Sequence, residues 1–96
     1  MKKISFLLLV SLMILNTGFP QCPGYLIIHS QEQIDMFPIE YPNCSEFEGY
    51  IIISGDNINN LLGLSNLTSI GGYFNIENNP LLTSLAGLEN LTAIND

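Results

Sequence analysis

The chain has 96 residues, with only two Lys and Arg against nine Asp and Glu, and its formal net charge is −7. Both basic residues, Lys2 and Lys3, lie at the start of the chain. The rest of the sequence has no cation that could neutralise phosphate groups, which excludes binding to nucleic acid and attraction to anionic lipid.

Residues 1–20 have the layout of a secretory signal peptide. The two lysines precede a mainly apolar segment, residues 4–15, and small and polar residues follow at 16–18. The apolar segment is shorter than the roughly 20 residues that span a bilayer. The sequence therefore predicts a secreted or cell-surface protein with no stable membrane span after cleavage. Cleavage would remove both lysines and change the formal charge from −7 to −9.

Residues 21–49 are predicted to form a small N-terminal cap. The two cysteines of the chain, Cys22 and Cys44, both lie in this segment. Because an exported chain meets an oxidising environment, we expect them to form a disulfide. The alternative, metal binding by two thiols and the single histidine, His29, makes a poor site.

Within the cap, residues 25–29 form a short apolar run that predicts a strand. Ser30 and Gln33 have the spacing of a capping box, which predicts the start of a helix at Ser30. Pro38 is expected to end this helix, because the residue before a proline avoids helical angles. One edge of the helix is apolar and consists of Ile34 and Phe37.

Residues 50–96 contain an internal repeat of about 24 residues. Residues 50–72 align with 74–96 at eight identical positions, five of which are Leu or Ile. The aligned pairs are Ile52 and Ile76, Leu61 and Leu85, Gly63 and Gly87, Leu64 and Leu88, Asn66 and Asn90, Leu67 and Leu91, Thr68 and Thr92, and Ile70 and Ile94. A unit of this length cannot bury its own apolar face, so the two copies are expected to stack as coils of a solenoid.

Each coil is expected to begin with a strand, at residues 50–53 and 73–76. Apolar side chains then recur at every third position, from Ile58 to Ile70 and from Leu82 to Ile94. The glycines, asparagines, serines and threonines between them disfavour a helix, so we expect a chain that bends around a narrow core. The equivalent Asn66 and Asn90 are expected to stack, with amides that bond to the backbone and to each other.

The string Gly-Leu-x-Asn-Leu-Thr-x-Ile, which starts at Gly63 and again at Gly87, is followed in the first copy by Gly71-Gly72 and a strand. Over roughly residues 22–96 this pattern resembles the receptor L-domain family, which is also found in exported bacterial surface proteins. The resemblance implies a mainly β fold: a right-handed β-helix or leucine-rich-repeat-like solenoid with a small disulfide-linked N-terminal cap containing one short helix. Because Asn95-Asp96 stands where the second copy would have its Gly-Gly pair, we expect a chain truncated at the C-terminus or a fragment of a longer array.

No catalytic, cofactor or metal site is predicted. His29 lacks a partner for a base–nucleophile pair, and Glu46 and Glu48 fit the solvent side of a strand. Calcium is the best metal alternative, because oxygen ligands occur in equivalent turns of adjacent coils. These turns are Asp56-Asn57 and Glu77-Asn78-Asn79. Such residues are also ordinary turn formers, so the turn role is preferred.

The sequence thus predicts an exported recognition or adhesion module that presents a solenoid surface to a protein or glycan. Tyr50, Tyr73 and Asn75 are the candidate surface contacts, since tyrosine is favoured at interfaces. One alternative is a structural spacer in a longer surface protein, and a distant one is a fragment of an exported polysaccharide-acting β-helix protein. An open last coil would expose a strand edge, which predicts edge-to-edge self-association.

Overall fold

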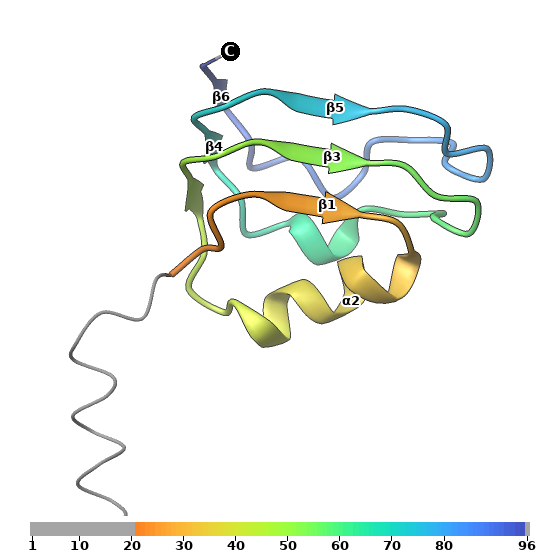
Figure 1. Ribbon diagram of the computed structural model, residues 1–96, viewed down its shortest axis with the longest axis horizontal. Coiled ribbons are helices and arrows are strands. Elements are labelled where there is room, and N and C mark those ends of the chain that lie inside the picture. The colour runs from red at the N-terminus through yellow and green to blue at the C-terminus, as the bar shows by residue number, and fades with distance from the viewer. Residues whose placement is uncertain (1–20, 96) are drawn as a thin grey trace, which may run out of the picture.

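The computed structural model describes residues 21–95, and the expected signal peptide, residues 1–20, lies outside this range. In the described part, six short strands form two parallel three-stranded sheets (Figure 1). Sheet A contains β1 (Leu26–Ile28), β3 (Ile51–Ile53) and β5 (Phe74–Ile76). Sheet B contains β2 (Glu46–Phe47), β4 (Ser69–Ile70) and β6 (Ala93–Ile94). The chain alternates between the sheets, so each coil supplies one strand to each. The first coil contains β1 and β2, and the two copies of the sequence repeat are the second coil, with β3 and β4, and the third coil, with β5 and β6.

The segment expected as a cap supplies the first strand of both sheets. β1 pairs with β3 and β2 pairs with β4, in parallel. Between β1 and β2 lies the helix α2 (Gln31–Glu40), which packs on the 3₁₀ turn η1 (Leu62–Leu64) of the next coil. The structure thus confirms a small, mainly β domain of stacked coils with one short helix. Among residues 21–95 we find no helix long and apolar enough to cross a membrane.

The start of α2 follows the sequence prediction closely. The Ser30 hydroxyl accepts a hydrogen bond from the Gln33 backbone N–H at 3.3 Å. The Gln33 side chain accepts a hydrogen bond from the His29 N–H and donates one to the Ile27 carbonyl. In a capping box it would instead accept from the N–H of Ser30, one residue after His29. In the first turn, hydrogen bonds from its own backbone N–H and from the Asn57 amide hold the pKa of Glu32 below its usual value. The N-terminus of the helix is therefore capped and joined to the second coil.

The predicted end of α2 is wrong, because the helix continues through Pro38 to Glu40. Proline has no N–H, so the Ile34 carbonyl loses its usual helical donor. Gly63 of η1 packs directly against this carbonyl, and a β-carbon at position 63 would collide with it. The Tyr41 N–H still bonds to the Phe37 carbonyl and closes the last turn. η1 thus packs against the helix at the carbonyl group that Pro38 leaves without a donor, and the helix continues for two more residues.

The narrow core lies between the two sheets and is complete in the second coil. Every member of the predicted third-residue series is buried there: Ile58, Leu61, Leu64, Leu67 and Ile70. The first coil and α2 add Ile28, Ile34, Phe37 and Phe47 to the same core cluster. The spacing of three therefore identified the inward side chains of this coil correctly.

The equivalent series in the third coil differs from the prediction, because none of its members is fully buried. Leu82, Leu88 and Leu91 are half-buried and pack against the core cluster. Leu85 and Ile94 are 58% and 46% exposed. The third coil repeats the residues of the second but has a described neighbour on one side only. Leu88 and Leu91 therefore lack the contacts that cover Leu64 and Leu67, their equivalents one coil earlier.

One pairing of the sequence alignment is wrong. The shift of 24 residues aligns Ile52 with Ile76, but sheet A pairs Ile52 with Asn75 and Ile53 with Ile76. Paired residues of β3 and β5 are therefore 23 apart in the sequence, whereas in sheet B Ile70 pairs with Ile94, 24 residues later. The additional residue of the third coil therefore lies between β5 and β6. Since a one-residue slip moves a strand side chain to the other face, Ile52 faces outward and Ile53 enters the core.

The segment with every-third spacing contains a short helical turn, where the sequence predicts no helix. Leu62–Leu64 form the 3₁₀ turn η1, with Gly63 at its centre. A 3₁₀ helix has three residues per turn, which fits the spacing of the apolar positions. No longer helix follows in residues 65–95, so the prediction of a bending chain holds outside this one turn.

Asparagine side chains join successive coils, although the main contact is Asn79. Its Nδ2 donates to the Ile53 carbonyl at 3.1 Å, and its Oδ1 accepts from the Gly55 N–H at 2.8 Å. Asn90 makes a simpler contact, because its Nδ2 donates to the Ser65 carbonyl at 2.8 Å. The expected amide-to-backbone bond is thus present at Asn90. The structure shows no amide-to-amide bond from Asn90 to the exposed Asn66.

Replacement of Asn79 by alanine is expected to lower the free energy of unfolding by about 2–3 kcal/mol. The change removes its bonds to the second coil and a third bond to the Glu77 carbonyl, each worth about 1 kcal/mol. Urea titration of the oxidised chain measures the loss. Asn66→Ala is the matched control and should stay within about 0.5 kcal/mol of the parent. Equal losses in the two variants would contradict a joining role for Asn79.

Candidate binding surface

Three tyrosines form a column along the outer face of sheet A. Tyr25, Tyr50 and Tyr73 each precede a strand by one residue, and the strand register sets them above one another. The ring centroids of Tyr25 and Tyr50 lie 5.5 Å apart and those of Tyr50 and Tyr73 lie 4.9 Å apart, with planes inclined by 13° and 10°. Tyr25 is 57% exposed and Tyr73 is 43% exposed, while Tyr50 is half-buried between them. The stack therefore holds each ring in a fixed orientation at the surface.

A second row runs beside the tyrosines. It consists of Ile27, Ile52 and Asn75, which pair across sheet A and are half-buried. Side chains alternate between the faces of a strand, and the neighbours of Ile52 are buried in the core. The row therefore points outward with the tyrosines. We call these two rows the sheet A face: Tyr25, Tyr50, Tyr73, Ile27, Ile52 and Asn75.

The structure brings together all three residues that the sequence offered as surface contacts, Tyr50, Tyr73 and Asn75. Their contact with a partner stays a prediction. Sequence reasoning missed Tyr25, because it treated the first strand as part of a cap. A signal was present, since a tyrosine stands immediately before each of the three apolar strand sequences. It shows only when all three strands are aligned.

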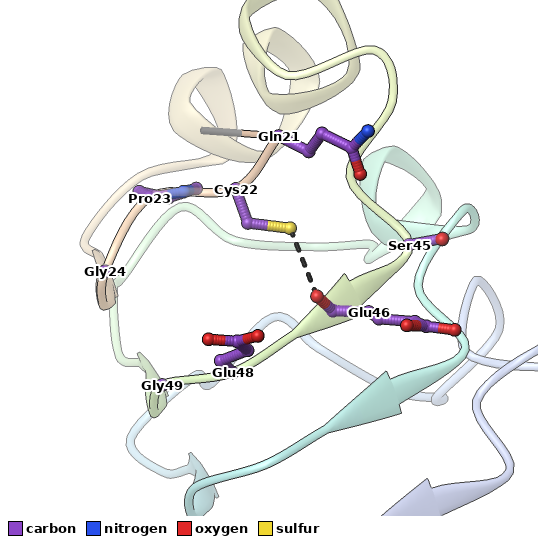
Figure 2. Close-up of a pocket in the computed structure, with 8 residues that line it drawn as sticks. All are labelled: Gln21, Cys22, Pro23, Gly24, Ser45, Glu46, Glu48 and Gly49. Atoms are coloured by element: carbon purple, nitrogen blue, oxygen red, sulfur yellow. Dashed lines mark hydrogen bonds between the residues drawn. The ribbon is translucent and has the colours of Figure 1, made fainter. Parts of the chain in front are cut away.

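A cavity of about 630 Å³ lies at the N-terminal end of the described residues (Figure 2). Its lining comes from two segments, residues 21–24 and 45–49, which lead into Tyr25 and Tyr50. Two exposed carboxylates, those of Glu46 and Glu48, are part of this lining. The cavity is thus acidic and adjoins the start of the sheet A face.

The predicted disulfide between Cys22 and Cys44 is confirmed and fastens this end of the stack. The Cys22 sulfur also lies 3.5 Å from the Glu46 carbonyl oxygen (Figure 2). A disulfide sulfur has no hydrogen to donate, so this is a packing contact. Together, the bond and the contact hold residues 21–24 against the second segment of the cavity.

Residues 21–95 contain no group of three or more His, Cys, Asp and Glu side chains positioned to hold a metal ion. Asp56, Glu77 and His29 are exposed at separate turns or strand ends. The surface that the coils assemble is an aromatic and apolar face with an acidic border, which suits binding.

The model of one protein family, described as receptor L domain, matches residues 43–96, which is more than half of the chain. The chain belongs to the receptor L domain family. Receptor L domains are non-catalytic modules that bind ligands. No curated protein and no solved structure gave a match.

The match places most of the sheet A face inside the receptor L domain. Tyr50, Tyr73 and Asn75 lie within residues 43–96, whereas Tyr25 and Cys22 precede the match. The first coil nevertheless continues the same two sheets. The tyrosine column therefore begins outside the matched residues and runs into them.

Proposed function

We propose that this receptor L domain is an extracellular recognition module that presents the sheet A face to a protein or glycan partner. The observation that carries the proposal is the column of three stacked tyrosines on a sheet whose opposite side is the core. Family membership supports ligand binding. The disulfide supports an oxidising compartment outside the cytosol, which residues 1–20 would allow the chain to reach as a signal peptide.

The arrangement of the tyrosines favours tight contact. A tyrosine offers a large ring and a polar hydroxyl, and it has few rotatable bonds. Here each ring is already held by its neighbours, so little further conformational freedom is lost when a partner binds. The half-buried Ile27 and Ile52 extend the apolar area beside the rings. A preformed surface of this kind can supply most of the binding energy from a few residues.

Two finer points of architecture belong to the same proposal. Connections between parallel strands are right-handed in nearly all proteins, so we assign the coils to a right-handed β-helix. β5 and β6, like β1 and β2, are paired on one side only in the described part, and the outer edges of β5 and β6 are the proposed site of edge-to-edge self-association.

The Tyr50→Ser variant is expected to weaken partner binding at least about tenfold, because the central ring of the column is removed. The oxidised chain is screened against arrays of extracellular protein domains and of glycans, and each hit is titrated with parent and variant by surface plasmon resonance. Met36→Ser, an exposed side chain on α2, is the control and should leave the affinity unchanged. Partners that bind parent and Tyr50→Ser equally well, or no partner at micromolar concentration, would reject the proposal.

A further inference from the structure

We propose that the partner of the sheet A face is a basic protein surface or peptide segment, in which Lys and Arg side chains surround an apolar contact. This inference rests on the proposed function and names the chemistry of the partner. Three observations lead to it: the charge of the chain, the position of the carboxylates around the face, and the way in which the tyrosine rings stack.

The exposed charge of this domain is of one sign. Residues 21–96 contain nine acids and no Lys or Arg. The eight acids within residues 21–95 are all exposed, so their side chains are accessible to a partner. The described part of the chain therefore has no basic side chain other than His29 that could balance them. An uncompensated negative surface attracts a positively charged partner and raises its association rate.

Carboxylates border the sheet A face at both ends of its strands. At the start, Glu48 lies two residues before Tyr50 and lines the cavity together with Glu46. At the far end, Glu77 directly follows β5 and is exposed. The centre between them is aromatic and apolar. An apolar centre with a charged rim is the usual composition of a protein–protein interface. Lys and Arg fit both parts, because their aliphatic stems pack on apolar surface while their charged ends reach the rim.

The stacking of the rings disfavours a glycan. A sugar ring binds best against the open flat face of an aromatic ring. In the column, the planes are inclined by only 13° and 10°, so the flat faces of Tyr50 are covered by its two neighbours. Only the end rings, Tyr25 and Tyr73, have a tyrosine on one flat face and not on both. The neighbouring row adds two isoleucines and a single amide, Asn75, and therefore few hydrogen-bonding groups for sugar hydroxyls.

The test selects ligands from a display library of random 12-residue peptides on the full oxidised chain, with a glycan array probed in parallel. We expect the enriched peptides to have net positive charge and at least one large apolar residue. Their affinity should fall as the salt concentration rises, since exposed charges are screened by ions. Tyr50→Ser should weaken binding at least about tenfold.

A second variant guards against loss of folding in Tyr50→Ser. Ile52→Asn places on β3 the residue that β5 already has at the paired position 75, so the fold can accept it. It should weaken binding as well. Glu48→Gln should lower the affinity about 1.5- to 5-fold, the size of one exposed ion pair, chiefly through the association rate. Glu40→Gln makes the same charge change on α2, away from the sheet A face, and should have a smaller effect.

The outcomes separate this inference from the proposed function. Enriched peptides that lack basic residues but lose binding in Tyr50→Ser would overturn the inference and leave the proposed function intact. Glycans that bind through Tyr50, with no enriched basic peptide, would do the same. Peptides that bind the parent and both sheet A variants equally would reject the proposed function itself. The absence of any enriched peptide or bound glycan would count against both.

Discussion

Replacement of Gly49 by alanine is expected to lower the free energy of unfolding by about 3 kcal/mol, whereas the same change at Gly24 should have almost no effect. A β-carbon at position 49 would collide with the Gly24 carbonyl oxygen of the coil below. The obstacle is backbone, so no side chain can rotate to make room. The coils would have to separate where β1 meets β3, and a domain of this size has only about 5–10 kcal/mol of stability in total.

Gly24 is a well-matched control, because it occupies the equivalent place one coil earlier and a β-carbon there would meet nothing within 4 Å. Neither glycine has a positive φ angle, so the comparison measures steric overlap and not backbone strain. Urea unfolding followed by circular dichroism gives both values. Similar losses at the two positions would mean that the coils are not packed as closely as the structure has them.

The repeat predicted the stacking, because leucine and isoleucine at equivalent positions have a direct physical meaning. It could not show that Leu88 and Leu91 are less covered than Leu64 and Leu67, because burial depends on the neighbouring layer and not on the residue itself. A linear pattern gives the inward positions of a coil. The depth of each position follows only from how many coils lie on either side.

The repeat also could not explain why glycine returns at positions 63 and 87. The reason is close approach: Gly63 packs against the Ile34 carbonyl, and Gly87 lies against the Leu61 carbonyl with φ of 112°. Such contacts join residues far apart in the sequence. A linear pattern therefore shows that a glycine recurs but not which backbone it meets.

Sheet B and the role of Asn79 were the larger omissions. The strands of sheet B have only two residues each, too few for an alternating pattern to appear. The sequence indicates a turn residue or calcium ligand at Asn79, and the alignment places Gly55 at the equivalent position. Its side chain in fact bonds to that same Gly55 N–H, which is a contact between layers. For the candidate surface, the strand boundaries alone place Tyr50 and Tyr73 at equivalent positions, which the stacking of their rings bears out, whereas their contact with a partner stays a prediction.

Removal of the Cys22–Cys44 disulfide is expected to cost about 3 kcal/mol, the chain-entropy value for a loop closed over a sequence separation of 22. The double variant Cys22→Ala/Cys44→Ala and the reduced parent both lack the cross-link, but only the reduced parent keeps the sulfur atoms. Cys44 is fully buried, so the double variant should lose somewhat more. Urea midpoints for the oxidised parent, reduced parent and double variant separate the contribution of the cross-link from that of the buried Cys44 sulfur atom.

The disulfide should also affect the tyrosine column unequally. It fastens residues 21–24, which lead into Tyr25, whereas Tyr50 and Tyr73 adjoin strands held by sheet A pairing on both sides of β3. Reduction should therefore loosen the Tyr25–Tyr50 contact first and leave the Tyr50–Tyr73 contact in place, as long as the chain remains folded. Near-ultraviolet circular dichroism tests this order in the reduced chain: there Tyr25→Ser should change the spectrum little, whereas Tyr73→Ser should still change it. Equally small changes from both substitutions below the unfolding midpoint would show that the column behaves as one unit with the disulfide.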